Sequence, residues 1–408
     1  MPGITDRARA LKDLFHARKR ILIDANDSDS DVIRQEMDSN LEMTAAIMSR
    51  RHFKRPLKYR NKGFNADAKF HGWLTENRFV VFTHMTRTSF EFVLHMISSN
   101  DVFVNPGIGS PSQQRSIYFQ LFIALTRLAS SGDGWCMDRI CEVFNIGHGT
   151  VATYTVRICT ALNDHQDTWI AWPNKAARAK LSAIGELKFG FPGFIASCDG
   201  TLVGLRRAPA FECFPETYHH HRHGGYGFNV LFWVDHHGSI IRFTCNWPAS
   251  ASDQTIFDDS NFAKEPWKYL KKHEEFIFTD LGFKKETFAV PPYKGQEAKL
   301  EYNALFNKAQ RRGRVKVEHC NGVIKARFSS LTAIPIDIRS DADHARVASW
   351  ITACVVLHNV LLHLRDEFEH EDVIVAEDEG PDTQESPGGK NFQNAVRDRW
   401  LKDVMNWT

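Results

Sequence analysis

The sequence has no apolar run near the roughly 20 residues that a helix needs to cross a bilayer. Its N-terminal stretch, MPGITDRARALKDLF, lacks the apolar core of a secretory signal. The 8 cysteines include no CxxC pair and no paired zinc spacing, which disfavours a disulfide framework and a zinc finger. Buried free thiols in a reducing compartment are the simpler interpretation. We therefore expect a nuclear or cytoplasmic chain without a membrane segment.

An excess of one charge sign is also absent. The 51 lysines and arginines nearly balance the 49 aspartates and glutamates, and the formal net charge is +2. Binding to a polyanion would therefore depend on where the charges lie rather than on their total. The sequence has no G-x-S-x-G elbow, no Walker loop and no G-x-G-x-x-G after a strand. These absences argue against a serine hydrolase, a P-loop NTPase and a dinucleotide-binding enzyme.

Charge is nevertheless concentrated at both ends of the chain. Residues 50–62 read RRHFKRPLKYRNK, and we expect residues 1–70 to form a basic, partly disordered arm. Two interpretations of the basic run stay open: a nuclear-localisation or phosphate-contacting segment, and a solvated loop. Residues 366–390 are acidic and then rich in proline, glycine and serine, as in a disordered tail. Residues 391–408 have apolar residues at helical spacing and predict a short C-terminal helix.

Two regions of different periodicity lie between these ends. Residues 71–170 have a helical pattern, whereas residues 190–365 begin with short β-rich runs and continue with two long helical patterns, near 297–328 and 341–364. The β-rich runs are FPGFIASCDG, YGFNVLFWVD, SIIRFTCNW, FIFTD and TFAVPPY. The pattern changes near 170–190. The sequence therefore predicts an α/β domain preceded by an all-helical region.

The helical region contains a candidate helix-turn-helix at residues 137–163. Ile140 and Phe144 would pack a first helix against a second one. The turn would be Asn145–Gly147, and the second helix would begin near Gly149–Thr150, with the threonine as its cap. Such a motif can bind DNA. Any two short packed helices give the same pattern, so the motif alone does not establish DNA binding.

Four acids stand where a sheet with flanking helices would bring them together. Asp199 ends the apolar run FIASC, and Asp280 ends the apolar run FIFT. Asp253 opens a predicted helix after the third β-rich run, and Glu318 lies in the middle of the first long helical pattern. Each acid alone is also consistent with a turn residue or a helix cap. Acids that close two separate apolar strands are harder to explain in that way.

Carboxylates at strand ends are suited to holding hard cations. Mg²⁺ requires oxygen ligands in rigid geometry, and strands hold their side chains rigidly. Two such ions about 4 Å apart can activate a water molecule and stabilise the leaving oxygen when a phosphodiester is cleaved. The four acids therefore predict a two-metal phosphodiesterase centre.

The helix with Glu318 adds candidate phosphate contacts. Five polar residues recur on one helical face: Asn307, Arg311, Arg314, Glu318 and Lys325. A carboxylate among basic and amide groups suits a metal ligand flanked by phosphate contacts. A solvated, salt-bridged surface is the alternative.

The histidine-rich run HHHRH at 219–223 could bind a transition metal. No histidine pair there has a convincing ligand spacing with a partner acid, so we interpret it as a basic surface loop. Its Arg222 joins Arg311, Arg314 and Lys325 as candidate DNA contacts.

Six motifs in order resemble those of Harbinger-type (PIF/Harbinger) DDE transposases. They are CDGT (198–201), GGYGFNVLFWVD (224–235), PASASDQTIFDDS (248–260), TDLGF (279–283), NKAQRRGRVKVEHCNGVIKARFSSL (307–331) and ACVVLHN (353–359). No single motif is decisive, but the set, with its RxxVExxxGxxKxRF ending, is specific. The resemblance covers roughly residues 75–365 and is strongest from residue 194 onward.

The resemblance implies a ribonuclease H-like catalytic domain, with a mixed five-stranded sheet flanked by helices, over residues 190–365. It implies that Asp199, Asp280 and Glu318 are the catalytic acids and hold Mg²⁺ or Mn²⁺, as two ions. It also implies that Asp253 is a further metal ligand or, in another alignment, the second acid of the triad in place of Asp280. The family's helix-turn-helix falls where residues 137–163 predict one.

The function implied is a metal-dependent DNA endonuclease, with strand transfer in a full transposase. DNA, a Myb-like DNA-binding partner protein and a second copy of the chain are the implied partners, and the nucleus, with a cytoplasmic pool, is the implied location. A domesticated, non-catalytic DNA-binding or scaffold protein is the competing interpretation. The chain departs from the family at Ala249 and Ser252, at Arg222 and at Phe283. None of these departures removes a carboxylate.

Overall fold

The computed structural model divides the chain into two compact units, Met1–Asn65 and Ala66–Thr408, which are considered separately. The residues that it describes are 11–17, 30–49, 74–104, 114–131, 136–220, 224–368, 386 and 388–405. In the first unit, residues 11–17 are helical and α2 covers Ser30–Ser49, where Asn40 donates a hydrogen bond to the Leu14 carbonyl at 3.1 Å. The basic run 50–62 and Arg222 lie outside the described residues, so the predictions for them stay predictions.

The second unit begins with helices, as the pattern predicted. They are α4 (Glu76–Thr83), α5 (Arg87–Ile97), α6 (Ile117–Leu128), α7 (Met137–Phe144), α8 (His148–Asn163), α9 (Gln166–Trp169) and α10 (Lys175–Phe189), with the 3₁₀ turn η2 (Asp101–Phe103). Serine and threonine side chains begin two of them: the Thr86 side chain accepts from the Ser89 N–H at α5, and Ser116 accepts from the Phe119 N–H at α6. Most of α6 is buried, which fits its nearly continuous apolar sequence.

Helices α7 and α8 form the pair predicted as a helix-turn-helix. Ile140 and Phe144 are buried, and Asn145 ends α7 in the left-handed conformation with φ of 49°. The predicted start of the second helix is wrong by one or two residues, because α8 begins at His148. Its N-cap is Gly147, which has no side chain, so Thr150 lies inside the first turn and is not the cap. DNA binding by this pair stays a prediction.

The sheet contains β1 (Phe194–Leu205), β2 (Tyr226–Val234), β3 (Ile240–Pro248), β4 (Phe276–Thr279) and β5 (Ala289–Val290). Their order is β3-β2-β1-β4-β5. The β1–β2 and β2–β3 pairs are antiparallel, whereas β4 pairs with β1 and β5 pairs with β4 in parallel. A mixed five-stranded sheet flanked by helices was predicted, and the ribonuclease H-like fold is confirmed.

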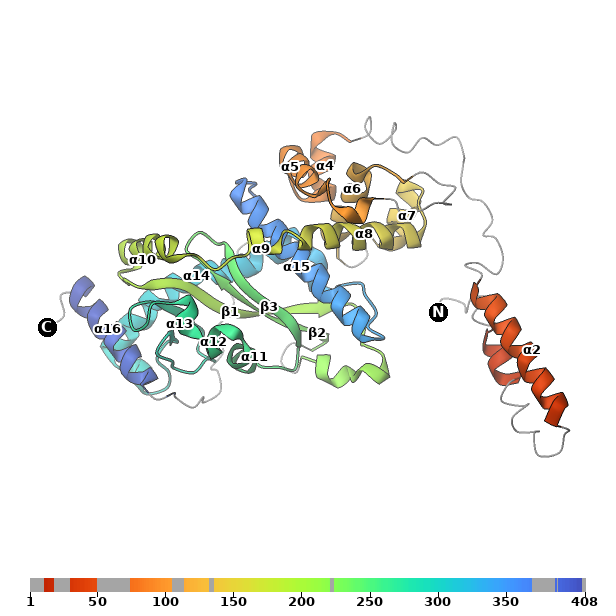
Figure 1. Ribbon diagram of the computed structural model, residues 1–408. Helices are drawn as coiled ribbons and strands as arrows, with labels where there is room; N and C mark the ends of the chain where they lie inside the picture. The colour runs from red at the N-terminus through yellow and green to blue at the C-terminus, as the bar shows by residue number, and fades with distance from the viewer. Residues whose placement is uncertain are drawn as a thin grey trace. The chain divides into compact units, whose positions relative to one another are not determined.

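Helices cover both faces of the sheet (Figure 1). The remaining elements are α11 (Asp253–Asp259), α12 (Asn261–Lys264), α13 (Pro266–Tyr269), α14 (Glu301–Arg327), α15 (Asp341–His363) and α16 (Gly389–Met405), with the turns η3 (Phe211–Cys213), η4 (Pro215–Tyr218), η5 (Glu297–Lys299) and η6 (Ser329–Thr332). Along β2, alternate residues belong to different cores: Phe228, Val230 and Phe232 pack with residues of α14 and α15, and Leu231 and Trp233 pack with residues of α11 and α12. This alternation follows from the two-residue period of a strand.

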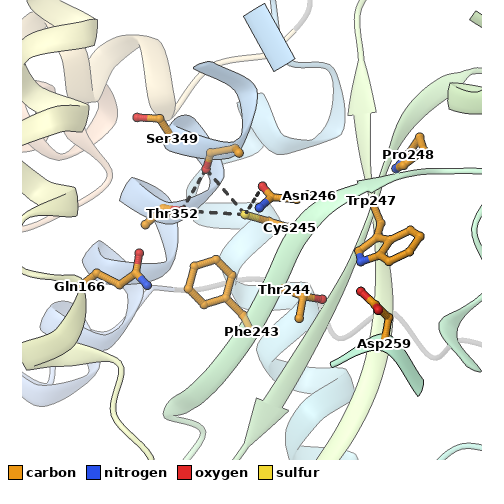
Figure 2. Close-up of a pocket in the computed structure, with 11 residues that line it drawn as sticks. Gln166, Phe243, Thr244, Cys245, Asn246, Trp247, Pro248, Asp259, Ser349 and Thr352 are labelled. Atoms are coloured by element: carbon orange, nitrogen blue, oxygen red, sulfur yellow. Dashed lines mark hydrogen bonds between the residues drawn. The ribbon is translucent and has the colours of Figure 1, made fainter. Parts of the chain in front are cut away.

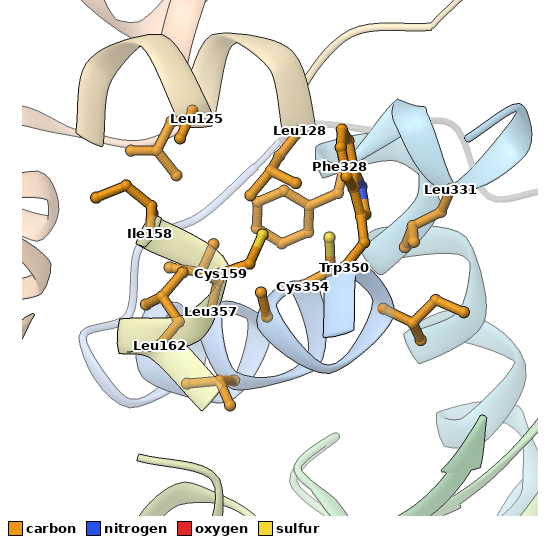
Figure 3. Packing of buried hydrophobic residues seen from close by; sticks show 14 of the residues in the cluster. Leu125, Leu128, Ile158, Cys159, Leu162, Phe328, Leu331, Trp350, Cys354 and Leu357 are labelled. Atoms are coloured by element: carbon orange, nitrogen blue, oxygen red, sulfur yellow. The ribbon is translucent and has the colours of Figure 1, made fainter. Parts of the chain in front are cut away.

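The helical region and the five-stranded sheet share one hydrophobic core. Figure 3 shows Leu125 of α6 and Ile158 of α8 packed close to Trp350 and Leu357 of α15. Helix α15 contacts both α8 and β3 and so joins the two regions, and the boundary predicted near residues 170–190 stays a prediction. Among the described residues, α15 is the one helix long and apolar enough to cross a membrane, but 72% of its apolar window is buried, as in a core helix.

The predicted acidic tail begins later than expected. Asp366 is held by Arg327, whose Nη1 lies 2.9 Å from the Asp366 Oδ1, so the residues up to Phe368 are part of the folded unit. The chain is described again from Gly388, and α16 packs on α14 and β5 with Trp400 buried. Residues 369–385 lie outside the described part of the chain.

Candidate active site

The register of the sheet places Asp199 beside Asp280. The last parallel pair between β1 and β4 is Cys198↔Thr279, and each aspartate follows directly. Adjacent strands are about 4.8 Å apart, and residues in register point to the same face. The prediction that Asp199 ends its strand is wrong, because β1 continues to Leu205 by pairing with β2. Because β4 ends at Thr279, β1 has no partner strand on that side beyond Cys198. Asp199 lies at this point, next to Asp280.

Helix α14 brings Glu318 to the same place. The Arg314 guanidinium joins two of the acids: its Nη1 lies 3.0 Å from Asp280 Oδ1, and its Nη2 lies 3.3 Å from Glu318 Oε1. Arg314 and Glu318 are four residues apart on one helix and so share a face. Three of the four predicted acids, Asp199, Asp280 and Glu318, therefore converge from β1, the end of β4 and α14.

Two further residues of α14 belong to this site. Asn321 Nδ2 donates to Asp199 Oδ2 at 3.3 Å. Burial lowers the pKa of Lys325 to about 8, and the negative charge of Asp199 raises it, which places the ammonium near that carboxylate. The sequence analysis missed Asn321, although it lies three residues after Glu318 and therefore on the same helical face. Spacing alone could have identified it.

Asp253 lies on the other face of the sheet. A Cβ added to Gly200 would lie 2.3 Å from Asp253 Oδ1, so the carboxylate occupies the space where a side chain at residue 200 would be. Successive side chains point to opposite faces, so this space is opposite the Asp199 side chain. Asn229 of β2 donates to Asp253 Oδ1 at 2.6 Å. This position favours Asp280 over Asp253 as the second acid of the triad, and the role of Asp253 as a further metal ligand stays a prediction.

The acids interact strongly. Burial raises the pKa of Asp199 to about 8, Arg314 lowers it, and the carboxylates of Asp280, Asp253 and Glu318 raise it further. Ionised carboxylates held this close repel one another. A bound cation would relieve this repulsion, so the electrostatics of the site suit a metal.

The donor set fits a hard divalent cation. Every acid that converges here offers carboxylate oxygen, which Mg²⁺ prefers. The Asn321 side-chain oxygen is buried and accepts no hydrogen bond, and Asp280 Oδ1 is buried beside the Arg314 guanidinium. Within the described residues, no three His, Cys, Asp or Glu side chains stand at metal-ligand spacing, and the Arg314 guanidinium contacts both Asp280 and Glu318. The carboxylates therefore suit a divalent cation chemically, and the Arg314 guanidinium lies between the Asp280 and Glu318 carboxylates.

The predicted DNA contacts have different surroundings. Arg314 is 2% exposed and pairs with the acids, and its predicted contact with phosphate stays a prediction. Lys325 is half-buried, and Asn307 exchanges hydrogen bonds with the backbone of Tyr293. Arg311 is exposed on α14 and stays a candidate.

The cavity in Figure 2 is separate from these acids. It has a volume of about 720 Å³ and follows β3, with Phe243 and Trp247 on one side and Ser349 and Thr352 of α15 on the other. None of the four predicted acids lines it. We therefore place the candidate chemistry at the junction of β1, β4 and α14 and not in this cavity.

Gly200→Ala should destabilise the fold. The added Cβ would meet the Asp253 carboxylate at 2.3 to 2.4 Å, so the acid must move and break its hydrogen bond with Asn229. Overpacking of this kind costs about 1–3 kcal/mol, measured by denaturant unfolding. Gly282→Ala is the matched control, since nothing lies within 4 Å of its added Cβ. Equal stability of the two variants would mean that Asp253 does not lie against Gly200.

Comparison with known proteins gives a family for the segment that forms this site. Residues 198–359 match the model of the family described as DDE superfamily endonuclease. The chain is also 23% identical over 301 residues to "Protein ALP1-like" of Arabidopsis thaliana, covering 69% of this chain and 70% of that protein. No solved structure matches the chain. The matched segment runs from the first of the six motifs to the last, and the resemblance to Harbinger-type transposases is confirmed.

Proposed function

We propose that this chain, whose residues 198–359 form a transposase-derived DDE superfamily endonuclease domain, cleaves DNA phosphodiester bonds with divalent metal ions. One observation supports this most: the register that sets Asp199 beside Asp280, with Glu318 of α14 joined to Asp280 through Arg314. Three carboxylates from two strand positions and a helix, in a segment of this family, are the parts that such a reaction requires.

Asp199, Asp280 and Glu318 would hold the metal, Mg²⁺ or Mn²⁺, as two ions. When bound, the ions supply an activated water and stabilise the leaving oxygen. Asn321 orients the Asp199 carboxylate by donating to its Oδ2. Arg314 holds the Asp280 and Glu318 carboxylates against mutual repulsion. Lys325 places a positive charge near Asp199, where a phosphate would add negative charge.

Wider roles follow from the resemblance and belong to the same proposal. In a complete transposase the freed 3′-hydroxyl attacks target DNA at the same centre. A Myb-like DNA-binding partner, self-association and a nuclear location with a cytoplasmic pool are proposed on this basis. The helix pair α7 and α8 is the candidate for DNA contacts away from the centre.

A domesticated, non-catalytic DNA-binding or scaffold protein is the second candidate. The Arg314 guanidinium favours it, because a cation of the chain itself already pairs with Asp280 and Glu318. An arginine in that place can neutralise the acids without a metal. Retention of all the acids favours the nuclease.

The test is cleavage of supercoiled plasmid in Mg²⁺ or Mn²⁺, with EDTA as the blank. We expect nicking by the wild type and a loss of at least about 10³-fold, or ~4 kcal/mol of activation free energy, in Glu318→Gln. Duplex binding should persist, because the substitution keeps the size of the side chain. Glu301→Gln, on an exposed residue of the same helix, is the control and should nick normally. DNA binding without nicking by the wild type would support the second candidate.

A further inference from the structure

Two cavities away from the acids meet in one groove. The smaller is about 170 Å³ and the larger about 570 Å³, and both are lined by Arg127, Pro335 and Asp337. Their walls come from α6, α7, α8, the chain just after β1, residues 333–339 and the start of α15. We call this surface the arginine groove. None of the four predicted acids lines either cavity.

The arginine groove concentrates positive charge. Its arginines are Arg127, Arg157, Arg206, Arg207, Arg339 and Arg346, and its acids are Asp337 and Asp343. The excess of four positive charges on one small surface exceeds the net charge of +2 of the whole chain. Among the described residues that line the groove there is no lysine. A guanidinium presents a planar fork of donors that matches phosphate oxygens, so the arginines favour a phosphate ligand.

The rim of the groove is accessible to solvent. The side chains of Arg207, Arg339 and Arg346 are 67%, 72% and 61% exposed. Each lies 2.8 to 3.4 Å from Asp337 or Asp343, but exposed ion pairs contribute only about 0–1 kcal/mol. Such pairs orient the arginines and leave donors for a further anion, because a guanidinium has five N–H groups.

The floor of the groove is fixed. The Arg127 guanidinium lies over the Trp350 ring at 5.0 Å and donates to Thr155 Oγ1 at 3.3 Å. Ser130 and Ser131 also line the smaller cavity, and the Ser130 hydroxyl donates to the Thr126 carbonyl at 2.6 Å, which fixes that side chain. A half-buried, fixed arginine below three exposed arginines gives a surface that can contact several phosphates in succession.

We infer that the arginine groove binds the sugar-phosphate backbone of duplex DNA beside the point of cleavage. This inference depends on the proposed function for the identity of the polyanion. β1 connects the two sites: Asp199 and Leu205, the last residue of β1 before the groove, are about 20 Å apart at a strand rise of ~3.3 Å per residue. That length corresponds to about six base pairs of B-DNA. One duplex can therefore reach both sites.

The test is duplex binding by fluorescence anisotropy at several salt concentrations, in EDTA, with Asp199→Asn as the background to prevent cleavage. The groove variant is Arg207→Gln/Arg339→Gln/Arg346→Gln. We expect the negative slope of log affinity against log salt to become shallower by about 2–3, since each phosphate contact contributes about 0.9 to its magnitude. Affinity near 0.1 M salt should decrease at least about tenfold. The Arg→Lys version should keep the slope, because it keeps the charge.

The matched control is Lys264→Gln/Lys268→Gln/Lys271→Gln, which removes the same charge from lysines that are also exposed and paired with acids. Equal loss of DNA binding in the control and groove variants would overturn the inference. Loss of binding to an acidic polypeptide, but not to DNA, in the groove variant would overturn it too. Plasmid nicking tests the proposed function separately. If the wild type does not nick but the salt dependence of its DNA binding changes in the groove variant, only the proposed nuclease activity is contradicted.

Discussion

Asp199→Asn is expected to reduce metal-dependent nicking of supercoiled plasmid by at least about 10³-fold, or ~4 kcal/mol of activation free energy. The change keeps the shape of the side chain and its contact with Asn321 but removes the charge that a metal requires. Asp280→Asn should have an equal effect, because the two carboxylates are neighbours in the parallel register. A nicking assay on agarose gels in Mg²⁺, with duplex binding measured in EDTA, distinguishes loss of DNA cleavage from loss of DNA binding.

Two controls make this result specific. Asp258→Asn changes an exposed acid on α11 and should nick at the wild-type rate. Asp253→Asn should lose less than about tenfold, because Asp253 lies on the opposite face of the sheet from Asp199. If Asp253→Asn is as inactive as Asp280→Asn, the assignment of the second triad acid made here is wrong.

Arg327→Met should lower the free energy of unfolding by about 3–5 kcal/mol. Arg327 and Asp366 are both almost fully buried, and their side chains lie 2.9 Å apart. The Asp366 carboxylate also accepts from the Thr86 backbone N–H at 2.9 Å and from the Thr86 hydroxyl at 2.8 Å. Removing the guanidinium leaves a buried negative charge with only these neutral donors. Urea unfolding followed by circular dichroism measures the change.

The double variant Arg327→Met/Asp366→Asn isolates the pair. It removes both charges, so its stability should exceed that of Arg327→Met alone, and Arg207→Met provides a control at an exposed pair. If the double variant is no more stable than the single one, the cost of Arg327→Met comes from lost packing, for example with the Phe368 ring beneath the guanidinium.

The same pair predicts a dependence on pH. Burial raises the pKa of Asp366, but hydrogen bonds from Ser89 and Thr86 and the charge of Arg327 outweigh it, so the pKa is lowered. A carboxyl whose pKa is depressed by folding stabilises the fold above its unfolded pKa, about 3.9, and loses this contribution as the pH falls through the folded pKa. Wild-type stability should therefore fall more steeply than that of Asp366→Asn below about pH 4. Urea unfolding of both proteins at a series of pH values measures this. Equal slopes of unfolding free energy against pH would refute the prediction.

The strands could be predicted because their sequences are apolar on both faces. β2 reads YGFNVLFWV and is buried almost throughout, as expected of a strand between two helical layers. The length of β1 could not be predicted in the same way. Its second half, GTLVGL, is interrupted by two glycines and a threonine, and pairing with β2 shows that it is strand. The local sequence pattern predicted that β1 ends at Asp199, whereas its pairing with β2 continues the strand to Leu205.

The candidate site was predictable in its acids but not in its arrangement. The motifs identified four carboxylates, and the structure separates Asp253 from the other three because α11 packs on the opposite face. Spacing placed Arg314 on one face with Glu318, but its burial could not be predicted, since helical spacing reveals which residues share a face and not which face is buried. That distinction depends on what packs against α14.

The shared core has a consequence for how the chain is made on the ribosome. Helices α6 and α8 bury apolar side chains against α15, which begins at Asp341, roughly 180 residues after α8 ends. At about 5–20 residues per second, that stretch takes roughly 10–40 s to synthesise. During this time the emerging helices lack their partner, and their apolar faces are exposed to chaperones or to other nascent chains. The helical region therefore cannot complete its fold until α15 has been synthesised.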